Sequence, residues 1–192
     1  MDNGFPVYGC GIDVGYDIGN PEMYLRAMCD SLNGKLNIRV MEERILPNGN
    51  IWVQGYSEDS IKRREEIIRK HKTSRLYIHG AALIGRHTRI GDFSKIQDSN
   101  IDNFCIIGNH VNLERTAVMD AAKIGDSAHL SDSIVGRKVV IESTSVIGNC
   151  VHIRKGCKLV RTKVNPGLIL PSGMTYRDKF LQNYEDVAEL AS

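Results

Sequence analysis

The chain has 192 residues, of which 42% are hydrophobic and 25% are charged, and its formal net charge at pH 7 is +2. This near balance argues against a nucleic-acid footprint, which normally requires a strong basic surplus. No apolar run is long enough to span a bilayer, and the five cysteines form no C-x-x-C pair. We therefore expect a cytoplasmic protein with reduced thiols, built as one elongated domain plus an N-terminal segment, with neither nucleic acid nor a membrane as partner.

The N-terminal segment predicts a strand-like opening followed by a helix. Residues 4–19 are rich in glycine, and a helix is expected from Pro21 to about Leu32, because proline suits the first helical position. Asn33 and Gly34 then form a stop signal. This part of the chain is expected to be a small module distinct from the remaining residues.

A second helix is expected after an extended segment at residues 37–53, which contains Trp52. Ser57 is the expected N-cap, and the acidic start and basic end of the helix agree with the helix macrodipole. The helix has a narrow apolar face, made of Ile61, Ile67 and Ile68. Its other charged residues are expected to form a solvated face and not a binding patch: Lys62, Arg63, Arg64, Glu65 and Glu66.

An aliphatic residue then recurs every six residues, occasionally five, over most of the remaining chain. The series is Ile78, Ile84, Ile90, Ile96, Ile101, Ile107, Leu113, Met119, Ile124, Leu130, Val135, Ile141, Ile147, Ile153, Leu159 and Val164. A helix would need spacings of three and four, and a plain strand would alternate. The six-residue period predicts a hexapeptide parallel β-helix, in which neighbouring turns stack and bury one another.

Three hexads per turn predict about five coils, which begin at Ile78, Ile96, Leu113, Leu130 and Ile147. Glycine follows many of the aliphatic residues, and we expect it at corners whose backbone a Cβ would resist. A capping segment is expected to start at Val164, with a final helix across the open end. The predicted divisions are an N-terminal segment at 1–36, linker strands and a helix at 37–77, the β-helix at 78–170, and the capping helix at 171–192, its helical part at 176–190.

Two stretches resemble sugar-1-phosphate nucleotidyltransferases, the nucleotide-sugar pyrophosphorylases. Residues 15–27, GYDIGNPEMYLRA, are similar to the W-x-D-I-G-T-P-E-x-Y-L-x-A stretch that precedes the β-helix in that family. Residues 115–141 are similar to the hexapeptide domain of its mannose-1-phosphate guanylyltransferases and of their ADP-glucose or glucose-1-phosphate thymidylyl relatives. The resemblance implies that residues 1–36 are the end of a nucleotidyltransferase catalytic domain and that the β-helix is left-handed.

The resemblance also implies a metal ligand. Asp17 matches the second metal-binding aspartate of the family, which holds Mg²⁺ together with another carboxylate. The usual tryptophan before it is absent, and Asn20 replaces a threonine. The alternative for Asp17 is a turn or cap residue before the helix at Pro21. Mg²⁺ is therefore expected only in a complete catalytic domain, and the resemblance assigns no further catalytic or cofactor-binding residue.

The intact family joins a nucleoside triphosphate to a sugar 1-phosphate and releases pyrophosphate, and this resemblance favours the GDP-mannose type. The family's Gly-rich phosphate loop, G-x-G-T-R-L-x-P-L-T, has no counterpart in this sequence. We therefore expect the chain alone to be inactive as a pyrophosphorylase. Its expected role is oligomerisation or regulation, as a homo-oligomer or beside a catalytic nucleotidyltransferase subunit.

A hexapeptide-repeat acyltransferase that uses acetyl-CoA or acyl-CoA is the alternative. Such an enzyme uses a histidine as general base, and histidine titrates near neutral pH. The candidates are His79, His87, His110, His129 and His152. Of these, His110 and His129 are expected on the same side of successive coils. The repeat count leaves no room for the long inserted loop that such acyltransferases usually have, and scattered surface histidines are the simpler explanation.

Overall fold

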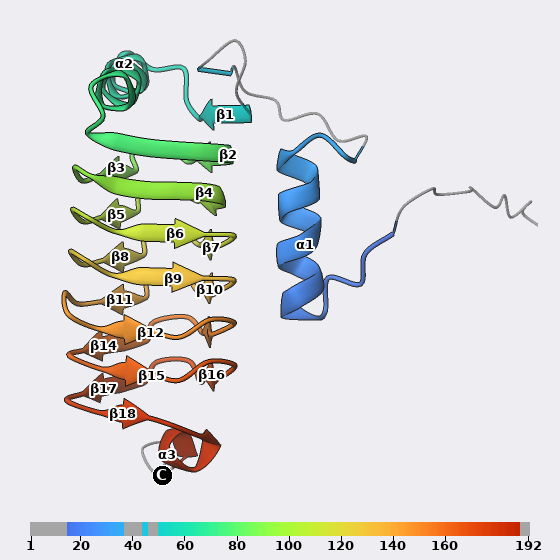
Figure 1. The fold of residues 1–192 in the computed structure, drawn as a ribbon, viewed down its shortest axis with the longest axis vertical. Helices are drawn as coiled ribbons and strands as arrows, with labels where there is room; N and C mark the ends of the chain where they lie inside the picture. The colour runs from blue at the N-terminus through green and yellow to red at the C-terminus, as the bar shows by residue number, and fades with distance from the viewer. Residues whose placement is uncertain (1–14, 37–43, 46–49, 189–192) are drawn as a thin grey trace, which may run out of the picture.

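The computed structural model describes residues 15–36, 44–45 and 50–188. Most of the predicted strand-like opening and much of the segment at 37–53 therefore lie outside the described residues. The described chain forms a column of short parallel strands, with helix α1 beside it and helices α2 and α3 at its two ends (Figure 1). The predicted hexapeptide β-helix is confirmed.

Each turn of the column has three faces. The first face contains β2 (Leu76–Ile84), β4 (Ser94–Ile101), β6 (Asn112–Glu114), β9 (His129–Ser131), β12 (Val146–Ile147), β15 (Lys163–Val164) and β18 (Phe180–Leu181). The second contains β1 (Asn50–Val53), the ends of β2 and β4, β7 (Ala117–Val118), β10 (Ile134–Val135), β13 (His152–Ile153) and β16 (Ile169–Leu170). The third contains β3 (Arg89–Ile90), β5 (Ile106–Ile107), β8 (Lys123–Ile124), β11 (Val140–Ile141), β14 (Lys158–Val160) and β17 (Thr175–Arg177).

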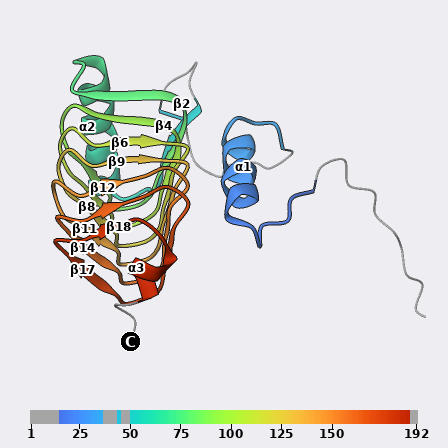
Figure 2. The same ribbon diagram turned by 60° about the horizontal axis from the view of Figure 1, so that its bottom comes forward.

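The coil is left-handed. In Figure 1 the strands of the first face run from left to right in front, those of the third face return behind them, and the chain descends. Figure 2 shows the same turns stacked along one axis, with α1 outside the column. All the strand pairs of the column are parallel, because each strand pairs with its equivalent one turn away.

The core is a set of stacked aliphatic columns. On the first face the inward positions are Ile78, Ile96, Leu113, Leu130, Ile147, Val164 and Leu181, all at most 5% exposed. The steps between these seven positions make six turns, one more than the predicted five. The sixth turn was missed because its inward residue on the third face is the aromatic Tyr176, which replaces the usual aliphatic and is fully buried.

The C-terminal end differs from the sequence prediction. Strands β17 and β18 occupy residues that were expected to begin the final helix, and α3 spans only Tyr184–Ala188. Val187 of this short helix is buried in the core cluster, so α3 does cover the last turn. The expectation of a helix over 176–190 is therefore wrong, because residues 171–181 complete another stacked coil.

The glycines that follow inward aliphatic residues are required by close approach and not by backbone angle. A Cβ on Gly91 would lie 2.4 Å from the carbonyl carbon of Gly108 in the next turn. Positive φ angles occur instead at later corner positions held by side-chain-bearing residues, such as Phe93 (58°) and His110 (56°). The prediction that Cβ is resisted at these glycines holds, but its cause is the packing of one coil on the next.

Helix α1 (Pro21–Leu32) confirms the first predicted helix. Asn20 caps it, because its side chain accepts a hydrogen bond of 2.9 Å from the backbone N–H of Glu22. Leu25 packs with Ala117 and Ile134 on the second face. The helix therefore shields part of that face from solvent.

Helix α2 (Glu58–Lys72) confirms the second predicted helix and its Ser57 cap. Only part of its expected apolar face is correct: Ile67 is buried, whereas Ile61 is 47% exposed. Arg63 and Arg64 donate hydrogen bonds to the backbone carbonyls of Gln54 and Gly55, respectively. These two arginines are thus partly buried, and the prediction of a fully solvated charged face is wrong for them.

Candidate functional site

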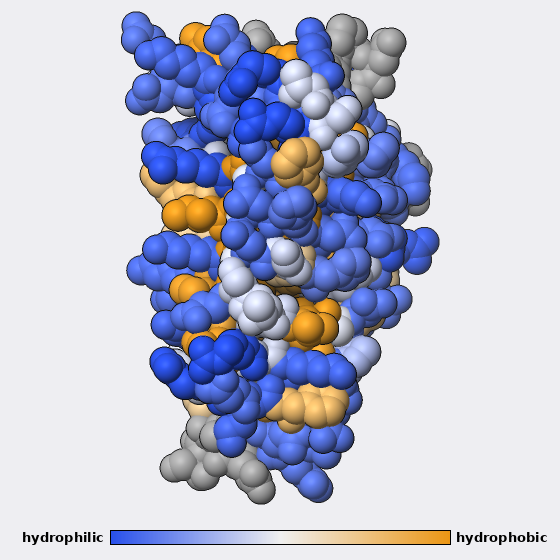
Figure 3. Space-filling view, turned by 60° about the vertical axis from the view of Figure 1, so that its left-hand side comes forward, coloured by the Kyte–Doolittle hydropathy of each residue, from blue (hydrophilic) through white to orange (hydrophobic). Residues whose placement is uncertain are grey.

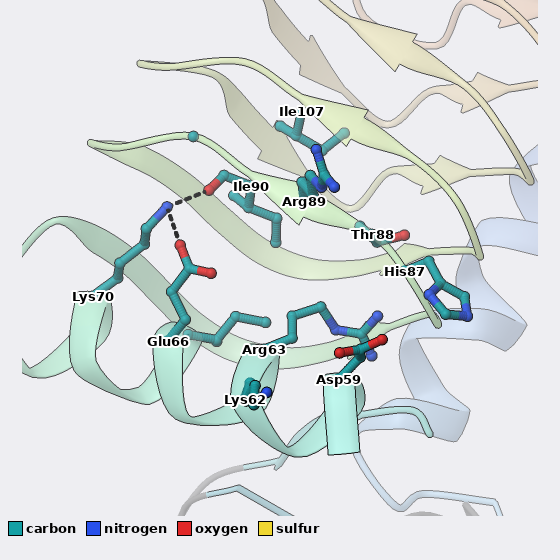
Figure 4. A pocket seen from close by; sticks show the side chains of 12 residues that line it. Asp59, Lys62, Arg63, Glu66, Lys70, His87, Thr88, Arg89, Ile90 and Ile107 are labelled. Atoms are coloured by element: carbon teal, nitrogen blue, oxygen red, sulfur yellow. Dashed lines mark hydrogen bonds and ion pairs between the residues drawn. The ribbon is translucent and has the colours of Figure 1, made fainter. Parts of the chain in front are cut away.

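Helix α2 lies across the open end of the first coil and leaves a cavity of about 650 Å³ beneath it (Figure 4). Three buried side chains make the apolar part of the wall: Ile67 from α2, Ile90 from β3 and Ile107 from β5. The charged part contains four cationic and two anionic side chains: Lys62, Arg63, Lys70, Arg89, Asp59 and Glu66. The cavity therefore joins an apolar floor to a rim with excess positive charge.

Lys70 fastens α2 to the first coil. Its Nζ donates a hydrogen bond of 2.8 Å to the carbonyl of Ile90, and it lies 3.2 Å from both Glu66 and Asp92. Arg75 also bonds Asp92, and these two cations hold the pKa of that carboxyl below its usual value, with Arg75 the larger influence. Lys70 is therefore neutralised within the protein.

Arg63 also lines the cavity but, unlike Lys70, has no carboxylate partner among the described residues. Its Nη2 donates to the backbone carbonyl of Gln54. Its Nε is buried and has no hydrogen-bond acceptor among the described residues. Burial, together with the positive charge of Arg64, lowers the pKa of Arg63 below its usual value. A partly buried guanidinium without a carboxylate partner attracts an anion.

A second hollow, of about 530 Å³, lies between α1 and the second face of the β-helix. Its wall is mostly apolar and includes Leu25, Ile134 and Ile169. Arg115 and Asp132 close one side with a bidentate ion pair, in which Nε and Nη2 donate to the two carboxylate oxygens at 2.6 and 2.7 Å. This pair spans two successive turns.

Two groups that line this hollow are held in their uncharged forms. Burial raises the pKa of the Cys29 thiol to about 11, and the thiol donates to the carbonyl of Asp98 at 3.4 Å. Burial, followed by the charge of Arg154, lowers the pKa of His152. The hollow therefore suits an uncharged or apolar surface better than an ion.

Asp17 lies in an exposed turn before α1. Its Oδ1 accepts a hydrogen bond of 3.1 Å from the backbone N–H of Gly19, as the turn alternative requires. Among residues 15–36, 44–45 and 50–188, no three histidine, cysteine or acidic side chains gather as a metal would need. The described residues thus provide one carboxylate and not a set of ligands for Mg²⁺, whose role with Asp17 stays a prediction.

The predicted histidines are dispersed around the column. His110 occupies a corner and stacks on Phe93 with ring centroids 5.3 Å apart, whereas His129 begins β9 and accepts from Asn112 at 3.1 Å. The register pairs Asn112 with His129, so the two histidines stand in different columns. Within the described chain, no histidine is hydrogen-bonded to a carboxylate that could orient it as a base.

A comparison with protein-family models matches residues 74–172 to the GMPPB C-terminal domain. These residues are more than half of the chain and contain most of the β-helix.

The chain belongs to the GMPPB C-terminal domain family.

A comparison with curated proteins found no match. Several solved structures with hexapeptide repeats are similar in part. A hexapeptide transferase family protein from Anaplasma phagocytophilum is 20% identical, with 61% of this chain and 81% of that chain covered and a TM-score of 0.39. The acetyltransferase domain of PglB from Neisseria gonorrhoeae is 17% identical, with 61% and 60% covered and a TM-score of 0.30. A hexapeptide-repeat acetyltransferase from Vibrio cholerae is 15% identical, with 86% of each chain covered and a TM-score of 0.23.

The match to the GMPPB C-terminal domain begins after α2 and ends before β17. Asp17 and α1 lie before the matched residues. The cavity beneath α2 is built from both parts of the chain: Lys62 and Arg63 precede residue 74, where the match begins, and Arg89 lies within the match. This cavity was not predicted from the sequence. The signal was the spacing of residues 59, 62, 63, 66 and 70, which places their side chains on one face of a helix.

The Arg115–Asp132 pair of the GMPPB C-terminal domain predicts acid sensitivity. Arg115 holds the pKa of Asp132 below its usual value, so the pair stabilises the fold above the unfolded-state pKa of about 3.9 and this stabilisation is lost as pH falls through the folded-state pKa. In the Asp132→Asn variant residue 132 no longer titrates, so the free energy of unfolding should fall less steeply as the pH is lowered. Because Arg115 is 41% exposed, the expected effect at pH 7 is only about 0.2–1 kcal/mol.

Denaturant unfolding at several pH values below neutrality measures this prediction. Arg115→Gln is the matched variant, since it removes the cation and leaves the carboxylate. Both variants should show the same reduced slope of unfolding free energy against pH, and the double variant should add nothing further. A slope for Asp132→Asn equal to that of the unmodified chain would contradict the assignment.

In the part of the chain that the structure describes, no helix has both the length and the apolar composition of a membrane span.

Proposed function

We propose that this chain is the C-terminal part of a sugar-1-phosphate nucleotidyltransferase of the GDP-mannose type, and that it serves assembly or regulation. Membership of the GMPPB C-terminal domain family is the observation that carries the proposal. The architecture supports it, because a β-helix has flat, rigid sides and a core that needs no ligand. The chemistry of joining a nucleoside triphosphate to a sugar 1-phosphate would belong to a complete catalytic domain, where Asp17 would contribute one carboxylate toward Mg²⁺.

The surface supports an assembly role. Figure 3 shows hydrophobic side chains that interrupt a mostly hydrophilic surface along the length of the column. Phe104 and Ile106, at the start of the third face, are 60% and 45% exposed, and Phe93, at the neighbouring corner, is 47% exposed. These three side chains lie at the two corners and on the strand of one face, and large exposed apolar side chains on one face are typical of protein interfaces. We propose that a second copy of the chain covers these residues in a homo-oligomer.

Light scattering of the purified chain after size exclusion tests the assembly role. The chain should elute as an oligomer, and replacing both Phe104 and Ile106 with arginine should shift it to the monomer, because charges would be buried in the contact. Lys123→Arg, on the same face one turn beyond Ile106, is the control and should leave the oligomer intact. A chain that is monomeric at every concentration would contradict the proposed self-association.

The enzymatic alternatives have separate readouts. Pyrophosphate release from the chain with GTP, mannose 1-phosphate and Mg²⁺ would overturn the expectation that the chain alone is inactive. An acyltransferase should bind acetyl-CoA, and a ligand that binds only the native state raises the melting temperature. No thermal shift at saturating acetyl-CoA is expected, and a clear shift would favour the acyltransferase.

A further inference from the structure

The cavity beneath α2 has positive charge that the protein does not neutralise. Lys70 is paired with Glu66 and Asp92. For the other three cations, Lys62, Arg63 and Arg89, no ion pair is found within the described ranges. Asp59 is the one remaining carboxylate of the cavity wall among the residues that the structure describes. The wall therefore presents three cations and one anion to whatever fills it.

Arg63 adds a specific requirement to this charge. Its Nε is buried without an acceptor among the described residues, and such a group costs free energy until it is paired. A guanidinium presents its N–H groups in a planar fork that matches the oxygens of phosphate or carboxylate. The Nε itself is fully buried, so a ligand with several acceptor oxygens would meet the guanidinium at its terminal nitrogens and bring charge of the required sign.

The cavity is also suited to more than a single ion. Its volume of about 650 Å³ is within the usual range of small-molecule sites, about 300–1,000 Å³. Ile67 and Ile90 form its apolar floor but are only 4% and 7% exposed, so the aliphatic stems of the charged side chains supply the rest of the apolar wall. His87 stands beside it and stacks on Phe104, with ring centroids 4.9 Å apart and an interplanar angle of 16°. Such a wall accommodates a flat or apolar body attached to the anion.

We infer that the cavity between α2 and the first coil binds a small organic phosphate, with the phosphate near Lys62, Arg63 and Arg89 and the apolar part over Ile67 and Ile90 (Figure 4). A phosphate monoester carries about 1.5 to 2 negative charges at pH 7 and three acceptor oxygens, which match three cationic side chains better than one carboxylate would. The inference goes beyond the proposed assembly role, and Arg89 of the site lies in register beside Ile106 of the proposed contact.

Isothermal titration of the full chain with GMP, guanosine and inorganic phosphate tests the inference. GMP should bind, inorganic phosphate should bind more weakly because it lacks the apolar part, and guanosine should not bind detectably. The affinity for GMP should fall as salt is added. Absence of binding by GMP, or equal affinities for GMP and inorganic phosphate, would overturn the assignment of an organic phosphate.

Lys62→Gln and Arg89→Gln are the variants of choice, because both side chains are exposed and neither change should disturb the fold. Each is expected to weaken GMP binding about tenfold, the effect of losing one hydrogen bond to a charged group. Lys123→Gln is the matched control: it holds the position of Arg89 two turns further along the third face. Equal weakening by Lys123→Gln, or no weakening by the two cavity variants, would show non-specific charge attraction and overturn the site.

Arg63→Lys provides a second measure. It keeps the positive charge and removes the planar fork, so GMP should bind more weakly while the salt dependence remains. Circular dichroism and the melting temperature report whether this variant is folded. A folded Arg63→Lys variant with unchanged affinity for GMP would exclude Arg63 from the site.

Discussion

Ile147→Ala is expected to lower the free energy of unfolding by about 2–5 kcal/mol, because it leaves a cavity in a stacked column. Ile147 is 3% exposed and lies directly over Val164 of the next turn. The core of a β-helix has few alternative contacts, since each inward side chain meets mainly its equivalents one turn away. The surrounding coils are therefore expected to collapse little into the space.

Val146→Ala is the matched control, because Val146 is the preceding residue of the same strand and points outward at 53% exposure. It should change the unfolding free energy by less than about 0.5 kcal/mol. Denaturant unfolding measures both variants, and the melting temperature should fall by about 2–4 °C per kcal/mol for a chain of this size. Equal losses for the two variants would contradict the inward and outward assignment of β12.

Gly91→Ala is the second change with a large expected effect. Its Cβ would lie 2.4 Å from both the carbonyl carbon and the oxygen of Gly108, which is backbone and cannot rotate away. The first two coils would have to separate locally, and overpacking of this kind costs about 1–3 kcal/mol or more. Gly91 also lines the cavity beneath α2, so the variant should weaken the packing of α2 on the first coil as well.

Gly19→Ala is the control for this prediction. Gly19 lies outside the coils, and its added Cβ would meet only the side-chain oxygen of Asp17 at 3.1 Å, which can move. Chemical unfolding should show little change for Gly19→Ala and a clear loss for Gly91→Ala. A Gly91→Ala variant as stable as the control would mean that the coils can separate at low cost.

The repeat itself was readable from the sequence because the physics of stacking is local in sequence. A core position recurs at the same step along the chain, so the aliphatic series from Ile78 to Val164 predicted most inward side chains of the first five turns. Met119 was wrong, because Val118 is the inward residue of β7 and Met119 packs on the outside with the cluster around Leu25 of α1. The starts of α1 and α2 were likewise predicted, from Pro21 at the first helical position and from the Ser57 cap. Asn20, which caps α1 in the structure, was not predicted to do so. Tyr176 broke the pattern by residue type and hid the sixth turn.

The candidate site was not readable in the same way. The charged residues of α2 have the composition of a solvated face, and only the packing of α2 over the first coil turns Arg63 toward the carbonyl of Gln54 and the cavity. Arg89 is one of several cations on the third face, and its place at the first coil is what brings it to the same cavity as Lys62. Neither residue has a short motif that would mark it.

The amino-acid sequence was sufficient for the left-handed hexapeptide fold by resemblance, for most inward positions by their period, and for the two main helices by Pro21 and the Ser57 cap. Only the folded chain shows where the column ends, why Gly91 must be glycine, and that Lys62, Arg63 and Arg89 share one cavity. The physical reason is how far apart in the sequence the interacting residues lie. Period and capping act between residues that are close in sequence, whereas close approach of backbones and convergence of charge depend on which segments meet after folding.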